Sequence, residues 1–224
     1  MTTTPAAAPT EAVAALVHHR LAPVVVLDDA ADAPALGDAL VAGGLPVAEV
    51  TFRTPAARDA IARLADRGDL LVGAGTVLTP AQVDQAVAAG AAFVVSPGLS
   101  AAVVERCAEH GVVVVPGAVT PTEVMRALEL GLDLVKFFPA ATNGGAPALA
   151  ALASVFGGVR FVPTGGIGLR ELPDYLALAN VAAVGGSWMV PRDRIRARDV
   201  AGIAALTRDA VAAADGVRPR AQTT

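Results

Sequence analysis

The sequence predicts an α/β protein, a TIM (β/α)8 barrel with an extra N-terminal helix. Short runs of β-branched residues alternate with Ala-rich amphipathic stretches from about residue 23 to the end. These runs are apolar enough to be covered on both faces, as the strands of a parallel sheet are. The βα pairs recur roughly every 20–25 residues, which suits a compact barrel.

Caps and turns mark the boundaries of the predicted elements. Helices begin at a Thr followed by Pro, as at Thr54, Thr79 and Thr120, and several end at a glycine, as at Gly90 and Gly111. The predicted strands are Pro23–Leu27, Val47–Val50, Leu70–Gly73, Ala92–Val95, Val112–Val115, Leu132–Phe137, Arg160–Pro163 and Val181–Val184. The predicted helices are Glu11–Arg20, Ala33–Ala42, Pro55–Arg67, Pro80–Ala89, Ala101–His110, Pro121–Leu130, Ala146–Phe156, Leu172–Ala179 and Asp199–Ala214.

Length and composition indicate one domain. The chain has 224 residues, 54% of them hydrophobic and 17% charged, which excludes disorder and suits a large buried core. We expect a barrel domain over residues 11–216 between tails at 1–10 and 217–224. A doubly wound open sheet is the alternative, but GAGTVL and GGIGLR each lack the third glycine of a dinucleotide-binding loop.

Several classes of partner are not expected. The net charge of −4 argues against nucleic acid, and PRDRIRARD, whose arginines are interrupted by aspartates, is interpreted as a solvated face or subunit contact. Pro, Asn and Gly interrupt the longest uncharged stretch, residues 137–159, so no membrane span is expected. The N-terminus lacks the pattern of a signal peptide, which predicts a cytoplasmic protein. With three histidines, the single Cys107 and no HxxxH or CxxC spacing, no metal site is expected.

Lys136 is the only lysine among 17 basic residues. Arginine can replace a lysine that merely carries charge, but it cannot act as a nucleophilic amine. The alternation in LDLVKFFPA places Lys136 on the inward face of a strand if Val135 and Phe137 meet the helices. Burial disfavours the ammonium form and therefore favours attack on a carbonyl to give a Schiff base. The alternative is a core lysine held in an ion pair.

The second predicted strand carries polar side chains at alternate positions: Glu49, Thr51 and Arg53. A carboxyl group such as Glu49 can shuttle the protons that Schiff-base chemistry requires. The planar guanidinium of Arg53 suits a carboxylate, so a 2-oxo acid is the expected ligand, and Thr76 after the third strand could bind the same group. The alternatives are an internal Glu49–Arg53 salt bridge and a Thr76 that only caps a turn.

Small-residue turns follow the last two predicted strands, in FVPTGGIG and AVGGSWMV. In TIM barrels these two adjacent loops often bind phosphate through backbone N–H groups and a helix N-terminus. Gly165, Gly166 and Gly186 would let the backbone approach the anion, and Ser187 would add a hydroxyl. A plain tight turn is the alternative for either loop alone.

Six ordered motifs, EVTFRT, GAGTVLTP, SPG, KFFPA, PTGGI and GGSW, resemble those of the bacterial 2-keto-3-deoxy-6-phosphogluconate (KDPG) and 4-hydroxy-2-oxoglutarate (KHG) aldolase family over roughly residues 12–214. The resemblance implies a class I aldolase of TIM-barrel fold, usually a homotrimer. It needs no cofactor and cleaves a phosphorylated sugar acid of the Entner–Doudoroff route into pyruvate and glyceraldehyde 3-phosphate.

The resemblance also assigns roles to individual residues. Lys136 matches the Schiff-base lysine and Glu49 the general acid/base. Residues that match the substrate-binding positions are Arg53 and Thr76 for the carboxylate, Gly165, Gly166 and Ser187 for the phosphate, Phe138 for the pocket wall and Thr164 for stereochemical preference; Gly186 belongs to the second glycine loop. The chain departs from the family at Phe52, an outward position, and at Ala141, where members often have Glu.

Two rival functions are open from the sequence. The sister aldolase for the galactonate epimer has the same fold and lysine but lacks the Thr-x-Arg-Thr pattern seen at residues 51–54. A non-catalytic barrel could instead bind a phosphorylated ligand or pyridoxal phosphate through Lys136.

Overall fold

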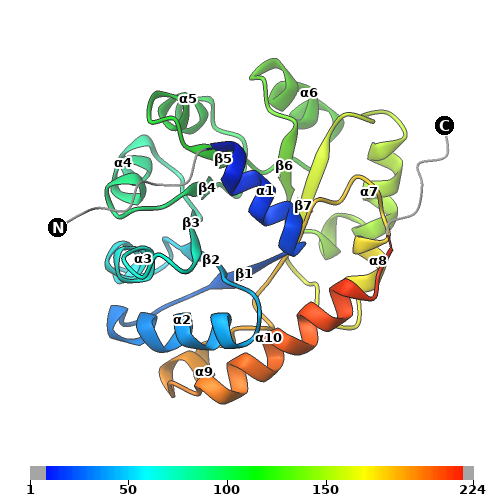
Figure 1. The fold of residues 1–224 in the computed structure, drawn as a ribbon. Helices are drawn as coiled ribbons and strands as arrows, with labels where there is room; N and C mark the ends of the chain where they lie inside the picture. Colours follow the sequence, from blue (N-terminus) through cyan, green and yellow to red (C-terminus); the bar gives the residue numbers. More distant parts are fainter. Residues whose placement is uncertain (1–8, 219–224) are drawn as a thin grey trace.

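The computed structural model describes residues 9–218, and within them it forms a barrel of parallel strands surrounded by helices (Figure 1). The strands are β1 (Leu21–Val25), β2 (Val47–Thr51), β3 (Leu71–Gly75), β4 (Phe93–Val95), β5 (Val113–Val115), β6 (Leu134–Phe137), β7 (Arg160–Pro163) and β8 (Val184–Gly186). The helices are α1 (Pro9–His19), α2 (Ala33–Ala42), α3 (Ala57–Ala65), α4 (Pro80–Ala88), α5 (Ala101–Glu109), α6 (Pro121–Glu129), α7 (Gly145–Ala153), α8 (Leu172–Leu176), α9 (Arg192–Arg196) and α10 (Val200–Asp215), with 3-10 turns η1 (Ala30–Asp32) and η2 (Ala141–Asn143).

Two sheets close into the barrel. One has the order β5-β4-β3-β2-β1-β8 and the other pairs β6 with β7. Isolated parallel bridges join the sheets at their two edges: Gly117 with Lys136 at the first, and Phe161 with Val181 and Thr164 with Gly185 at the second. At the first edge the Lys136 N–H donates to Pro116 O and the Ala118 N–H donates to Lys136 O, both at 2.8 Å. The predicted TIM-barrel class is confirmed, and Lys136 lies on the seam that closes the barrel.

Capping side chains explain where several helices begin. Thr79 and Thr120 begin α4 and α6 in capping boxes with Gln82 and Glu123, as their positions predict. The predicted cap at Thr54 is wrong, because its hydroxyl donates to Leu27 O and α3 begins at Ala57.

Other boundaries also differ from the predictions, most clearly near the C-terminal end of the barrel sequence. β8 begins at Val184 rather than Val181, because only from Val184 onward does the chain pair with β1. α8 begins at Leu172 as predicted but ends at Leu176 rather than Ala179. α9 is an additional helix within the arginine run PRDRIRARD, which was predicted to be a solvated face or subunit contact. Of the predicted tails, Pro9 and Thr10 belong to α1, whereas residues 1–8 and 219–224 lie outside the described residues.

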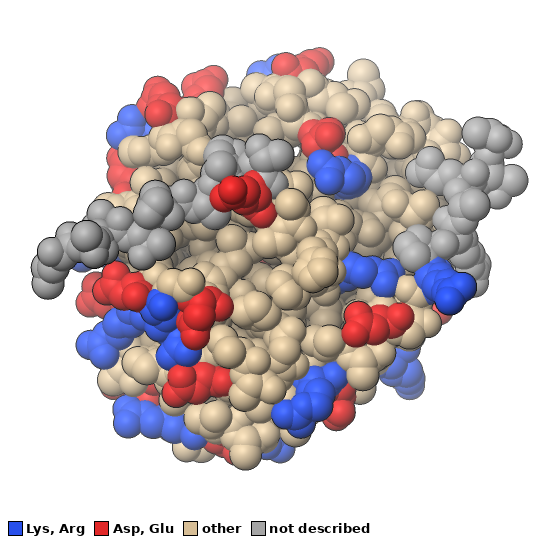
Figure 2. All heavy atoms as spheres, in the orientation of Figure 1, with Lys and Arg blue, Asp and Glu red and all other residues tan. Residues whose placement is uncertain are grey.

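Helix α1 crosses the ring of strands in Figure 1. Its Val13 lines a cavity of about 250 Å³ together with Val112 and Leu132, which lie at the starts of β5 and β6. This helix therefore covers the N-terminal end of the barrel and leaves the carboxyl ends of the strands for a site. On the face drawn in Figure 2, acidic and basic side chains are mixed around the margin. Within residues 9–218, no helix is both long and apolar enough to cross a membrane.

Candidate active site

Lys136 and Glu49 meet inside the barrel. They come from β6 and β2, and the Lys136 Nζ donates a hydrogen bond to Glu49 Oε1 at 3.1 Å. Their side chains are 6% and 2% exposed, so both groups are almost entirely removed from water. Two buried charges are tolerated when they are paired and hydrogen-bonded. The same contact places a carboxylate within proton-transfer distance of an amine.

Phe138 follows β6 and partly covers this pair. Its ring centroid lies 5.3 Å from Lys136 Nζ, within the range of a cation–π contact. Phe138 is 36% exposed and also lines the pocket described next, so it contacts both the buried amine and the pocket.

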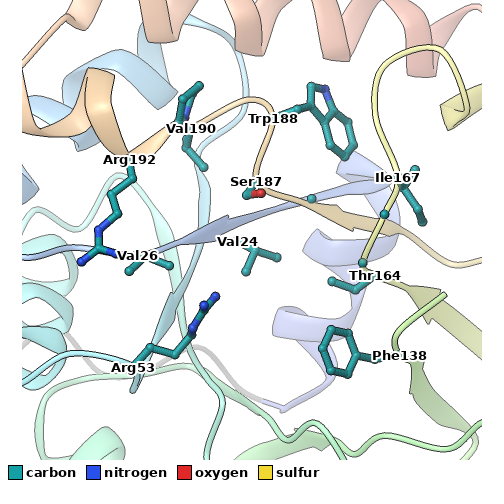
Figure 3. A pocket seen from close by; sticks show the side chains of 14 residues that line it. Val24, Val26, Arg53, Phe138, Thr164, Ile167, Ser187, Trp188, Val190 and Arg192 are labelled. Carbon is teal, nitrogen blue, oxygen red and sulfur yellow. The ribbon is translucent and has the colours of Figure 1, made fainter. Parts of the chain in front are cut away.

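A pocket of about 490 Å³ opens at the carboxyl ends of the strands (Figure 3). Most of the binding residues expected from the sequence line it: Arg53, Phe138, Thr164, Gly165, Gly166, Gly186 and Ser187. Lys136, Glu49 and Thr76 are not part of this lining. The structure therefore brings a buried reactive pair and an open binding pocket to the same end of the barrel, with Phe138 in contact with both.

Arg53 points into this pocket from the loop after β2 (Figure 3). The strand ends at Thr51, so Arg53 lies beyond the inward strand position expected for it. The alternative of an internal Glu49–Arg53 salt bridge is wrong, since Glu49 pairs with Lys136 and Arg53 has no ion-pair partner among residues 9–218. An exposed guanidinium without a counterion is available to an anionic ligand.

Thr76 directly follows β3 and adopts a left-handed backbone, with φ of 56°. This conformation is uncommon for a threonine, and such residues cluster at functional sites. The side chain is half-buried.

The loop after β7 requires glycine at two positions, because the backbone there has a positive φ and no space is left for a side chain. Gly165 and Gly166 have φ of 97° and 73°. A Cβ on Gly165 would lie 3.2 Å from the Phe138 ring, and one on Gly166 would lie 2.5 Å from the Cβ of Ala141. Within the described chain, the N–H groups of Gly166 and Ile167 donate to no other residue. Free backbone donors at a glycine turn are typical of anion-binding loops.

Neither glycine loop leads directly into a helix, although α8 begins at Leu172, where the sequence predicts it. α9 begins only at Arg192, and the Gly168 N–H is already bonded to Glu171 Oε2 at 3.1 Å. An anion in this pocket would therefore meet loop N–H groups and the Ser187 hydroxyl rather than the first turn of a helix.

Sequence reasoning missed several pocket residues. Arg192, assigned from the sequence to a solvated or subunit-contact run, lines the pocket and forms an ion pair with Asp28 after β1. This hydrogen bond lowers the pKa of the Asp28 carboxyl. The other missed lining residues are Val24, Val26, Ile167, Trp188, Val190 and Pro191. No local pattern distinguishes these positions, because the barrel closure brings them together.

The histidines, acidic residues and single cysteine of the described chain are arranged as follows. Between Pro9 and Arg218, no group of three or more His, Cys, Asp or Glu side chains is arranged to hold a metal ion. Cys107 is buried in α5, and burial raises the pKa of its thiol to about 12, which keeps it protonated and unreactive near neutral pH.

Comparison with known proteins places this chain in a family. The model of the aldolase family described as KDPG and KHG aldolase matches residues 13–206. The chain is 51% identical to the 2-dehydro-3-deoxy-phosphogluconate aldolase of Treponema pallidum over 195 residues, which is 87% of this chain and 93% of that protein. The chain belongs to the KDPG/KHG aldolase family.

Solved structures of KDPG aldolases share the fold. The enzyme of Zymomonas mobilis ZM4 with 3-phosphoglycerate superposes with a TM-score of 0.87 at 43% identity, covering 96% of this chain and 100% of that one. The enzyme of Legionella pneumophila, with pyruvate captured at low pH as a covalent carbinolamine intermediate, gives a TM-score of 0.85 at 42% identity over 88% of this chain and 96% of that one.

Proposed function

We propose that this chain cleaves 2-dehydro-3-deoxy-6-phosphogluconate into pyruvate and glyceraldehyde 3-phosphate, with Lys136 as the Schiff-base nucleophile and Glu49 as the proton shuttle. Family membership makes it a pyruvate-dependent class I aldolase, a carbon–carbon lyase. The observation that carries the residue assignment is the buried contact of 3.1 Å between Lys136 Nζ and Glu49 Oε1. Family membership also extends the proposal to 4-hydroxy-2-oxoglutarate, which would give pyruvate and glyoxylate.

The first half of the reaction forms an imine. Lys136 passes a proton to Glu49, with which it is hydrogen-bonded, and the resulting neutral amine attacks the C2 carbonyl. The C–N bond forms as the carbonyl electrons move to oxygen, and a proton moves from nitrogen to that oxygen to give a carbinolamine. Protonation of its hydroxyl by Glu49 expels water and leaves a protonated imine.

The second half breaks the bond between C3 and C4. Glu49, now a carboxylate, removes the proton of the C4 hydroxyl. The bond between C3 and C4 then breaks, the aldehyde formed at C4 leaves, and the bonding electrons pass into the imine to give an enamine. Protonation at C3 and hydrolysis of the imine release pyruvate and free Lys136. Because the protonated imine accepts the electrons, the family's reaction uses no metal.

The two anionic ends of the substrate suit different parts of the pocket. We assign the carboxylate to Arg53 and Thr76, because Arg53 is an exposed cation without a counterion among the described residues. The phosphate is assigned to Gly165, Gly166, Gly186 and Ser187, where the free N–H groups of the first loop support it.

Thr164 and Phe138 would line the space between the two anion sites. Thr164 is 5% exposed, and we propose that it contacts the substrate hydroxyls that distinguish the epimers. Ala141, where family members often have Glu, brings only a methyl group against Gly166, so a carboxylate at this point of the loop is lost.

Two broader assignments also rest on the family. A homotrimer is proposed, and light scattering would test it by returning three times the chain mass of 22.3 kDa. A cytoplasmic location stays a prediction, to be checked by fractionating cells that express the chain.

Pyruvate release from each epimeric substrate tests the proposed function. A coupled lactate dehydrogenase assay should show rapid release from 2-dehydro-3-deoxy-6-phosphogluconate, slower release from 4-hydroxy-2-oxoglutarate, and little from the galactonate epimer. Faster release from the galactonate epimer would make the chain the sister aldolase. No release from any of the three would contradict the aldolase assignment, and yellow colour from bound pyridoxal phosphate would favour a binding barrel.

A further inference from the structure

Strand β3 presents two glycines to the barrel interior, and the space beside each is occupied by a different side chain. A Cβ on Gly73 would lie 2.2 Å from the ring of Phe93, a fully buried core residue. A Cβ on Gly75 would lie 2.4 Å from Glu49 Oε1 and 2.8 Å from Glu49 Cγ. The space beside Gly73 is therefore filled by a core side chain, whereas the space beside Gly75 is filled by the carboxylate of the proposed proton shuttle, Glu49.

We propose that Gly75 is a positioning residue for the aldol reaction: its missing side chain provides the space in which Glu49 holds Oε1 against the amine of Lys136. The inference rests on the role of Glu49 in the proposed function. Oε1 is both the atom nearest to the absent Cβ and the atom that accepts the hydrogen bond from Lys136 Nζ.

The register of the strands explains why the gap is at residue 75. Glu49 pairs with Gly73 and Thr51 with Gly75, so the Glu49 carboxylate lies over the residue two positions beyond its own partner. Side chains on a strand lean along the strand direction. A glycine at 75 allows the carboxylate to lean toward the carboxyl end of the barrel, where the pocket opens.

Backbone conformation does not account for this glycine. The residue with a positive φ in this turn is Thr76, whereas Gly75 is absent from the positive-φ glycines of the described chain. Gly75 also keeps ordinary strand pairing, since its carbonyl accepts a bond of 2.8 Å from the Phe52 N–H. Alanine could adopt the same backbone, so the requirement for glycine is one of space.

An added methyl group has a predictable effect. Ordinary van der Waals contact begins near 3.4 Å, so Glu49 Oε1 must move by about 1 Å away from a Cβ at residue 75. Glu49 is 2% exposed and cannot swing into solvent. A misplacement of about 1 Å in a catalytic group can cost about 10²-fold in rate.

A double-mutant cycle between Gly75→Ala and Glu49→Ala tests the proposal. Gly75→Ala alone should lower kcat about 10²-fold and change the shape of the kcat–pH profile, because the carboxylate no longer lies against the amine. In the Glu49→Ala background the same change should alter kcat by less than about threefold, since no carboxylate remains to displace. Gly73→Ala is the matched control: it crowds Phe93 and should lower the Tm, with a much smaller loss of kcat.

The outcomes distinguish the proposed role of Gly75 from the proposed role of Glu49. An equal loss from Gly75→Ala in both backgrounds, or a wild-type kcat and pH profile in the single variant, would overturn the role of Gly75 alone. A near-normal kcat for Glu49→Ala would overturn the proposed function of Glu49, and the inference with it. If Gly75→Ala folds poorly, the cycle is measured by Tm: recovery in the Glu49→Ala background supports the proposal, and no recovery refutes it.

Discussion

At the scale of single residues, Lys136 and Glu49 form a contact that water cannot replace, because both side chains are nearly fully buried. Breaking one half of such a pair leaves an uncompensated buried charge. The sequence identified both residues, since a lone lysine and an alternating polar strand are local signals. It did not predict that Glu49 pairs with Lys136 while Arg53 has no ion-pair partner in the described part of the chain, because that choice depends on how the strands face one another.

Glu49→Gln separates catalysis from structure at this contact. Glutamine keeps the shape and the hydrogen bond to Lys136 but cannot accept a proton, so kcat should fall by about 10²–10⁴-fold while pyruvate still binds. Steady-state kinetics, pyruvate binding and Tm should be measured in the same variant. A near-normal kcat with a clearly lowered Tm would show that Glu49 only stabilises the barrel.

At the scale of elements, helices and strands were predictable where capping residues and apolar periodicity coincide, as at Thr79 and Thr120. Thr54 has the same sequence pattern, yet its hydroxyl bonds to the loop after β1 instead, which no local signal reveals. Helix α9 was missed because its charged residues follow no clear apolar period, and its Arg192 reaches the pocket only after the barrel closes.

Arg20, between α1 and β1, binds the C-terminal ends of two helices, α8 and α10. The Arg20 guanidinium donates to the carbonyls of Leu176, Ala214 and Val217, at 3.0, 2.9 and 2.7 Å, near the C-termini of α8 and α10. Arg20→Met should therefore lower the free energy of unfolding by about 1–3 kcal/mol, since hydrogen bonds from a charged donor are lost. Urea denaturation measures this change, and kcat should be preserved.

Arg58→Met is the control for Arg20, because Arg58 is 60% exposed and makes only a surface ion pair with Asp59. It should change the stability by less than about 0.5 kcal/mol. Equal effects of the two substitutions would mean that Arg20 contributes nothing specific to these helix ends.

The loop after β7 can be tested through the phosphate. Gly166→Ala adds a methyl group against Ala141 at a residue with φ of 73°, so the free N–H groups should move. We expect kcat/KM for the phosphorylated substrate to fall about 10–100-fold, the value of a hydrogen bond to a charged group, with little change for 4-hydroxy-2-oxoglutarate.

Gly131→Ala supplies a matched control for that experiment. Gly131 has a similar φ of 76° but open space around its Cβ position, and it lies near the opposite end of the barrel. It should affect both substrates equally and weakly. If Gly166→Ala also reduced the use of both substrates equally, the phosphate would bind elsewhere or the loop would be purely structural.

At the scale of the whole molecule, the repeated βα units predicted the barrel because each unit carries its own periodicity and turns. The details of barrel closure could not be predicted from the sequence, because the two sheets are joined by isolated backbone bridges at β6 and β7, which leave no side-chain pattern. These bridges connect the elements that carry the lysine and the glycine loops, so the fold and the site depend on the same contacts.

The imine mechanism predicts that the activity of the enzyme does not depend on a metal ion. Exhaustive treatment with a chelator should leave kcat unchanged, because the protonated imine on Lys136 accepts the electrons that a metal accepts in other aldolases. Activity should be compared before and after dialysis against the chelator, with and without added divalent ions. Loss of activity on chelation, followed by recovery with a divalent ion, would refute the imine mechanism.

Borohydride reduction in the presence of pyruvate tests most directly the claim that Lys136 forms the imine. Lys136 is the only lysine in the chain, so reduction should inactivate the enzyme and add one pyruvate-derived mass to the peptide that contains it. Lys136→Arg should take up no such mass at this position, because arginine forms no imine here. Mass found only on the N-terminal amine, with activity retained, would contradict the account.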